Sequence, residues 1–323
     1  MIKIEYECKV LTPMVVQGAE KNTSLRNDED LVIRVPSLKG VLRFWWRLFC
    51  EEKDVKEVRK REGMLFGCIG EKKESLKSNV KIQTRILEQK VKNNVDFFPF
   101  KGDVSREKKG GTFKGLDSET IFKVDFIIND TLYRVDDKKR IASNVLVEEI
   151  QETFERMALL GGLGLRSRRG FGTFQIRSKK IQSSKDKNSK QENVSWLTIE
   201  DVEKRIQRTD RRNCLHVKEL IVVQRNFENS EDALRAIDEV SHSVRKELGE
   251  VLEKELGRKK AEYTLGKALG TANKRQPSPL YMSVFQESQY YKIVITILEE
   301  NKNDKYREIQ EKFIQQIRRK YEQ

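Results

Sequence analysis

The segment from Gly161 to Gly172, GGLGLRSRRGFG, constrains the chain more than any other, because it gathers five of the eighteen glycines together with three arginines. Glycine allows positive φ angles and a close approach of the backbone to a ligand. Arginine offers a fork of donors that suits phosphate, and successive amides in a turn can face an anion. The segment therefore predicts a loop shaped around a polyanion, with nucleic acid as the leading candidate.

The charge balance also favours an acidic partner. The 323-residue chain has 65 Lys and Arg residues against 51 Asp and Glu residues, a net charge of +14 and a pI near 9.4. This balance suits RNA, DNA or an anionic membrane, and the alternative is a basic surface that serves only solubility. No apolar run approaches the roughly 18 residues that span a bilayer. We therefore expect a cytoplasmic protein with no membrane partner. The length of 323 residues is typical of two domains.

A β-α-β-β-α-β order is predicted for residues 1–180. Period-two alternation indicates strands, and the spacing of a single apolar face indicates helices. The expected elements are a strand from Ile2 to Val10, a helix from the N-cap Ser37 to Glu52, strands from Val80 to Leu87 and from Ile121 to Ile128, a helix from Asn144 to Leu160, and a strand from Thr173 to Arg177. This order is the split βαβ or ferredoxin-like arrangement, which RNA-recognition domains also use.

A linker is predicted at residues 181–193, because Ser, Asn and Lys dominate there and apolar residues are scarce. Residues 194–323 should form a second, less complete ferredoxin-like domain, so the expected fold class is α+β with two such domains. Its expected elements are helices from Thr198 to Gln207, Glu231 to Leu256 and Asp304 to Tyr321, and strands from Val217 to Gln224, Leu280 to Gln286 and Tyr291 to Leu298.

Three cations follow one another at steps of four along the first predicted helix: Lys39, Arg43 and Arg47. Like charges at this spacing cost roughly 0.2–0.5 kcal/mol per pair unless an anion or acidic neighbours compensate. No acidic residue lies between Ser37 and Cys50. The stripe is therefore a predicted RNA-binding surface, and the alternative is a solvated face. Trp46 lies between this stripe and the apolar face, where its indole can stack on a base or belong to the core.

In the glycine-arginine loop, the three arginines are predicted to neutralise phosphates, and the glycines to let amides face the anion. The alternative is a tight helix-to-strand turn, which explains only some of the glycines. The residues from Arg169 to Gly172 match the start of the RNP1 signature, but Thr173 replaces its next aromatic, so an ordinary RRM is not predicted. The RNA-binding candidates in the loop are Gly162, Gly164, Arg166, Arg168, Arg169 and Phe171.

Catalysis finds little support in the sequence. The only two histidines, His216 and His242, lie far along the chain from the loop, so no histidine-based cleavage site is expected. Cys214 and His216 can supply two metal ligands, but a buried thiol next to a surface imidazole is favoured. Asp28 and Asp30 can assist an RNA 2′-hydroxyl or bind magnesium, but polar loop residues are favoured. No metal, cofactor or catalytic residue is predicted.

A series of motifs, in order along the chain, resembles the RAMP superfamily of CRISPR proteins, and within it the family of first subunits of the Cmr complex, the type III-B RNA-guided effector. The motifs are Thr12-Pro13, the run from Pro36 to Arg47, Leu65-Phe66-Gly67, the run from Gly161 to Gly172, and the run from Arg275 to Leu280. They cover the first predicted domain well, whereas only the last motif falls in the second.

The resemblance implies two ferredoxin-like domains and a non-catalytic RNA-binding subunit. It implies contact with CRISPR RNA near its 3′ end, help in capturing target RNA, and other Cmr subunits as partners. Two alternatives stay open, because a fold does not fix a function. One is a metal-independent endoribonuclease that processes CRISPR precursor RNA, and the other is a protein scaffold whose RNA contacts are incidental.

Overall fold

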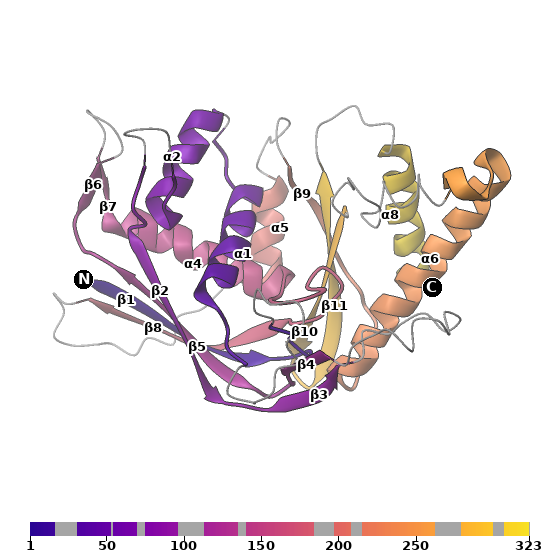
Figure 1. The fold of residues 1–323 in the computed structure, drawn as a ribbon, viewed down its shortest axis with the longest axis horizontal. Coiled ribbons are helices and arrows are strands. Elements are labelled where there is room, and N and C mark those ends of the chain that lie inside the picture. The colour runs from indigo at the N-terminus through magenta and orange to yellow at the C-terminus, as the bar shows by residue number, and fades with distance from the viewer. Residues whose placement is uncertain are drawn as a thin grey trace.

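The computed structural model shows a mixed α/β protein built on antiparallel sheets (Figure 1). It describes residues 1–16, 31–52, 54–69, 75–95, 113–134, 140–183, 197–207, 215–261, 279–299 and 307–322. The statements below concern these ranges.

The first sheet has four strands in the order β2 (Val80–Glu88), β5 (Ile121–Ile128), β1 (Ile2–Val10) and β8 (Phe174–Ser183). All neighbours are antiparallel, so β1 and β2 run in the same direction with β5 between them. This is the split βαβ arrangement that the sequence predicts for this half.

The two faces of the first sheet differ, as the alternation of β1 predicts. Helices α1 (Val35–Leu48) and α4 (Ser143–Leu160) pack on one face, where Ile4, Tyr6, Cys8 and Val10 of β1 are fully buried in a common core. The other face carries a ladder of paired charges, in which Lys3 Nζ lies 2.7 Å from a Glu5 oxygen and 3.0 Å from an Asp125 oxygen. This face offers a balanced charged surface.

The second sheet has three strands in the order β10 (Leu280–Glu287), β11 (Tyr290–Glu299) and β9 (His216–Val222). Both outer strands are antiparallel to β11, which again separates two parallel strands joined through a helix. Helices α5 (Ile199–Gln207), α6 (Ser230–Leu256) and α8 (Arg307–Glu322) also belong to this half, whereas α2 (Val55–Phe66) belongs to the first.

The second sheet is buried on both of its faces. Helices α1 and α4 of the first half lie against one face, and α6 and α8 cover the other (Figure 1). Val217, Tyr281 and Val294 accordingly belong to the core of the first half, while Met282 and Ile295 belong to a second core with α6 and α8. The halves therefore share a hydrophobic core rather than meeting through a wet interface.

Several boundaries differ from the sequence predictions. Strand β8 continues to Ser183, so the first residues of the predicted linker pair with β1; Ile181, for example, lies opposite Ile4. The predicted N-cap Ser37 is wrong, because α1 begins at Val35, where Pro36 suits the first turn. The helix also ends at Leu48 rather than Glu52. Most of the predicted linker lies outside the described residues.

Several elements were not predicted from the sequence. They are α2 and the small antiparallel pairs of β3 (Val91–Val95) with β4 (Phe113–Leu116) and of β6 (Leu132–Arg134) with β7 (Arg140–Ala142). The apolar positions of α2 are concentrated in its last turn, so it lacks the long apolar face that identifies a helix from sequence.

Candidate nucleic-acid interface

The basic stripe on α1 meets an acidic partner from another helix. Glu62 of α2 accepts two hydrogen bonds from Arg47, 2.6 Å from Nε and 2.7 Å from the terminal nitrogen. The two hydrogen bonds join ionised groups and are therefore charge-assisted, and the Glu62 carboxylate itself is almost fully buried. The expectation of a stripe without acidic neighbours is therefore corrected, although 58% of the Arg47 side chain remains exposed.

Arg43 is also occupied within the protein. Its guanidinium donates to the carbonyl oxygens of Phe66, at 3.1 Å, and Gly67, where α2 ends. The last carbonyls of a helix carry a partial negative charge and lack partners within the helix, so a cation stabilises them. Arg43 thus stabilises the C-terminal end of α2. Its Nε also lies 3.6 Å from a carboxylate oxygen of Glu62.

Lys39 differs from the two arginines of the stripe. Within the described part of the chain it makes no hydrogen bond and no ion pair, and partial burial and the neighbouring Arg43 both lower its pKa. The adjacent Gly40 leaves open space above the helix, since a Cβ there would meet no atom within 4 Å. The start of α1 therefore presents an uncompensated cation beside an open surface.

Trp46 does not provide an exposed stacking surface. The residue is 5% exposed, and its indole nitrogen donates to Glu149 of α4 at 3.0 Å. Arg61 of α2 donates to the same carboxylate. The indole is thus held between three helices, which corrects the prediction that it stacks on a base and supports the alternative that it belongs to the core. Trp45 is fully buried, as expected.

The glycines of the loop allow close packing inside the protein. A Cβ on Gly172, which has a φ of 66°, would lie 1.8 Å from the Leu163 carbonyl oxygen, and one on Gly164, with a φ of 90°, would lie 2.4 Å from that of Val15. At Gly162 the backbone of Phe171 is similarly close. These contacts correct the expectation that the glycines chiefly open the backbone to an anion, since the neighbouring chain takes that space.

Loop amides are likewise used internally. The amide of Leu163 donates to the carbonyl oxygen of Gly172 at 2.9 Å. The amide of Leu165 donates to the carbonyl oxygen of Val15 at 3.1 Å, and that of Gly172 to the carbonyl oxygen of Pro13 at 3.0 Å. Phe171 is 2% exposed and packs with Val15, Val95 and Leu234, so it does not offer a ring to RNA.

The arginines of the loop lie where the two halves meet. The Arg168 guanidinium lies 5.5 Å from the ring centroid of Phe44 on α1 and 5.0 Å from that of Tyr281 on β10. The Arg168 carbonyl accepts a hydrogen bond from the Met282 amide at 3.2 Å, and Arg169 forms a parallel bridge with Met282. The loop thus joins the first half to the edge of the second sheet, while Arg166 remains exposed at its tip.

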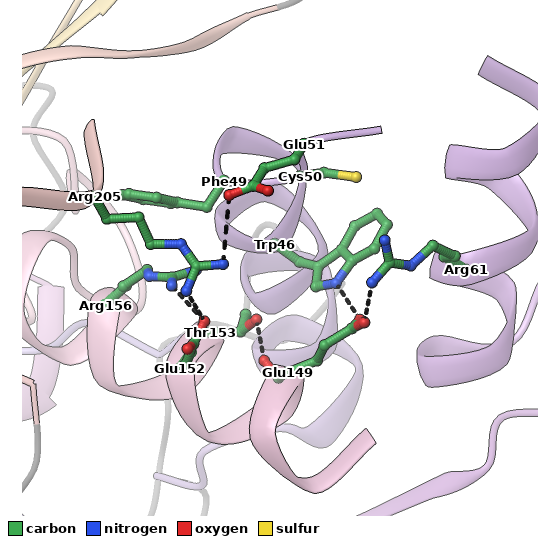
Figure 2. Close-up of a pocket in the computed structure, with 10 residues that line it drawn as sticks. All are labelled: Trp46, Phe49, Cys50, Glu51, Arg61, Glu149, Glu152, Thr153, Arg156 and Arg205. Atoms are coloured by element: carbon green, nitrogen blue, oxygen red, sulfur yellow. Dashed lines mark hydrogen bonds and ion pairs between the residues drawn. The ribbon is translucent and has the colours of Figure 1, made fainter. Parts of the chain in front are cut away.

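A small cavity of about 80 Å³ lies where α1, α2, α4 and α5 converge (Figure 2). Its walls carry arginines that pair with glutamates: Arg61 with Glu149, and Arg205 with Glu152 at 2.6 Å. Arg156 is almost fully buried and lies 4.4 Å from the Phe49 ring centroid. The lining charges compensate one another, and these partly exposed ion pairs connect the four helices around the cavity.

The described residues contain no group of three or more His, Cys, Asp or Glu side chains placed to hold a metal ion. His216 lies 4.0 Å from a Glu299 carboxylate, whereas Cys214, Asp28 and Asp30 fall outside the described ranges, as do most residues of the motif from Arg275 to Leu280. Each described helix is too short or too polar to cross a membrane.

Comparison with known structures relates this architecture to CRISPR effector proteins. The crystal structure of apo Cmr1 from Pyrococcus furiosus is 16% identical, with a TM-score of 0.57 over 94% of this chain and 89% of that one. A chain of a type III-B Cmr-beta complex bound to cognate target RNA is 12% identical, with a TM-score of 0.58 over 98% and 99%. A chain of a second such complex, with AMPPnP and in the presence of ssDNA, is 11% identical, with a TM-score of 0.59 over 99% of this chain and 99% of that one.

At these identities the likeness demonstrates a shared fold over nearly the whole length. No curated protein sequence matches the chain. The family model of the RAMP superfamily matches residues 7–175, which is just over half of the sequence and includes α1 and the whole glycine-arginine loop. The chain therefore belongs to the RAMP superfamily.

Proposed function

We propose that this protein is a non-catalytic RNA-binding subunit of a type III-B CRISPR effector complex. In this role it contacts CRISPR RNA near its 3′ end and helps capture target RNA in the cytoplasm, beside other Cmr subunits. RAMP membership and the resemblance in fold to Cmr1 and to Cmr-beta chains support the assignment. We also infer that both halves are ferredoxin-like domains, since each places a strand between two parallel strands joined through a helix.

Lys39 carries the proposal of RNA binding. It is a partly buried cation beside another cation, and the described residues supply no acid to compensate it. A phosphate would remove the repulsion that now exists between Lys39 and Arg43. The exposed start of α1 has no acidic side chain in its first turn, so nothing there repels an anion.

The proposed surface runs from Lys39 to the cations of the glycine-arginine loop. Phe44, one turn after Gly40 on α1, contacts the guanidinium of Arg168, so the helix and the loop form adjoining parts of one surface. Arg166 and Arg169 extend it, and Arg47 contributes its exposed part. Trp46 and Phe171 are buried and are not included.

Contacts of this kind hold phosphates and do not distinguish bases. We therefore propose that sequence is recognised through pairing of guide and target RNA, as in other RNA-guided systems. The outward face of the first sheet is not proposed as a stacking surface, because the charge ladder of Lys3, Glu5, Lys123 and Asp125 occupies it.

The test is a salt titration of single-stranded RNA binding by the full chain and by Lys39→Ala. Removing one phosphate contact should weaken binding to all sequences alike and reduce the slope of log K against log salt by about 0.7. Lys312→Ala is the matched control, since it removes the same charge from α8, where Lys312 pairs with Glu308 at 2.7 Å. Equal effects of the two substitutions would contradict the proposed surface.

The RNA recovered from these titrations should then be examined on a denaturing gel. Intact RNA is expected from a subunit that only holds its ligand. Cleavage at one defined position would instead identify an endoribonuclease. No binding by the wild-type chain, with assembly into a Cmr complex retained after Lys39→Ala, would identify a scaffold.

A further inference from the structure

The exposed side of α1 carries a second row of residues beside the basic stripe. Gly40 follows Lys39, and Phe44 follows Arg43, by one position each, so the two rows run side by side at an angle of about 100° around the helix. Gly40 is exposed and Phe44 is half-buried. The next position of the row, Leu48, is buried, so the row ends at Phe44, where α1 meets the glycine-arginine loop.

The space above Gly40 is open, although a side chain would fit there. A Cβ at this position would have no atom within 4 Å in the described part of the chain, so even the Phe44 ring does not reach over it. Glycine destabilises the interior of a helix relative to alanine, but it lets a ligand approach the backbone closely. Packing inside the protein therefore gives no reason for a glycine here, whereas an external ligand does.

The Phe44 ring lies one turn from this space and is held in place by its neighbours. Its centroid lies 5.8 Å from that of Trp45 and 5.5 Å from that of Tyr281, and both of these residues are buried. The Arg168 guanidinium lies 5.5 Å from the Phe44 centroid. A ring that is already held loses little conformational freedom when a ligand binds, and an aromatic ring is a surface on which any base can stack.

We propose that Gly40 and Phe44 form a base-binding subsite for single-stranded RNA, in which one base lies over the α1 backbone at Gly40 and against the Phe44 ring. This rests on the proposed function. The phosphates of the same strand lie along the adjacent stripe at Lys39, since α1 contains no acidic residue that would repel them. Stacking is tolerant of sequence, so the subsite adds affinity without adding a strong preference among bases.

An abasic oligonucleotide of the same length separates base stacking from phosphate binding. Phe44→Leu should weaken the binding of single-stranded RNA about tenfold or more, through the loss of one base–aromatic contact. It should leave the affinity for the abasic oligonucleotide and the salt dependence unchanged, because no phosphate contact is removed. Phe44→Tyr, which keeps a ring, should bind RNA as the wild-type chain does.

Gly40→Leu tests the open space without disturbing internal packing. It should raise the Tm of the full chain, because leucine favours a helix more than glycine does. It should nevertheless weaken RNA binding about tenfold or more, because the new side chain fills the space of the base.

Tyr290→Leu is the control for the loss of an aromatic ring. Tyr290 is exposed and pairs with Glu287, at the opposite end of β10 from Tyr281. This substitution should leave RNA binding unchanged, and a loss equal to that of Phe44→Leu would overturn the subsite.

The other outcomes separate this inference from the proposed function. Unchanged RNA binding in either Phe44→Leu or Gly40→Leu, with weaker binding after Lys39→Ala, would overturn the base subsite and leave the proposed function intact. Equal losses for RNA and for the abasic oligonucleotide in Phe44→Leu would also overturn the subsite, because the ring would then act only by positioning the basic surface. No binding of either oligonucleotide by the wild-type chain would overturn the proposed function itself.

Discussion

The guanidinium of Arg168 lies 5.0 Å from the ring centroid of Tyr281, and this contact crosses from the glycine-arginine loop to β10 of the second half. Tyr281 in turn packs against Phe44 and Trp45 of α1, with ring centroids 5.5 and 5.3 Å away. A loop with the composition of a phosphate clamp is therefore also part of the joint that holds the halves together. The loop that we propose for RNA binding and the joint between the halves therefore use the same few residues.

The aromatic joint should be a major contributor to stability. Tyr281→Ala removes a buried ring shared by both halves, so it should lower the free energy of unfolding by about 3–5 kcal/mol. Tyr290→Ala, at an exposed position at the start of β11, should change it by less than about 0.5 kcal/mol. Urea denaturation of the variants measures both values, and similar losses would contradict the role of Tyr281.

A double-mutant cycle between Arg168→Ala and Tyr281→Ala isolates the cation–π contact. Because the guanidinium lies over a ring at a partly desolvated site, a coupling energy of about 0.5–2 kcal/mol is expected. Additive effects of the two substitutions would show that Arg168 contributes nothing through Tyr281.

The loop glycines should tolerate no side chain where the backbone is close. Gly172→Ala combines a strained φ with a clash against the Leu163 carbonyl, so a loss of about 2–6 kcal/mol in unfolding free energy is expected. Gly40→Ala on α1 adds a methyl group where space is open, and it should stabilise the protein by about 0.5–1 kcal/mol. Thermal unfolding compares the two, and a tolerated alanine at position 172 would contradict the packing.

Glu62 should stabilise the fold and reduce the RNA affinity of the basic stripe formed by Lys39, Arg43 and Arg47. Glu62→Gln weakens the pairing with Arg47 and removes a buried charge near Arg43, so it should cost about 1–3 kcal/mol of stability. The freed cations should at the same time increase RNA affinity at low salt. Glu57→Gln, which breaks the exposed pair with Lys60, is the control for loss of one acidic residue. Affinity that rises equally in both variants would show only a net-charge effect.

Acid should weaken the charge ladder on the first sheet. Burial alone would raise the pKa of Glu5, but hydrogen bonds from Lys123 and Lys3 outweigh it and hold the pKa below its ordinary value of 4.5. A group with a lowered folded-state pKa stabilises the protein above its unfolded-state pKa, and this stabilisation disappears as pH falls through the folded-state pKa. Stability should therefore decline from about pH 5 downward.

Glu5→Gln should flatten this part of the pH profile, as measured by urea unfolding between pH 6 and pH 3, a range that brackets the usual carboxyl pKa of about 4. A hydrogen bond from Lys312 also lowers the pKa of Glu308, but this pair is exposed on α8. Because solvent screens such a pair, Glu308→Gln should leave the profile nearly unchanged. An unchanged profile in Glu5→Gln would contradict the assignment.

The sequence by itself determined the order of the main elements and the burial of their apolar faces. Alternation in β1 and the apolar spacing of α4 are local properties, since a strand or helix repeats at a fixed period whatever it packs against. They fixed the β-α-β-β-α-β order of the first half and the position of the loop. The same patterns placed α6 and the pair of β10 with β11 in the second half.

Only the tertiary structure decided what the predicted site residues touch. Glu62 lies fifteen positions after Arg47, on a helix with a weak pattern, so nothing in α1 itself showed that its arginines are compensated. Tyr281 approaches the loop only because the second sheet packs on α1 and α4. A charge or glycine pattern records residue type, but its energy depends on neighbours brought close by folding, and these are set by packing rather than by spacing along the chain.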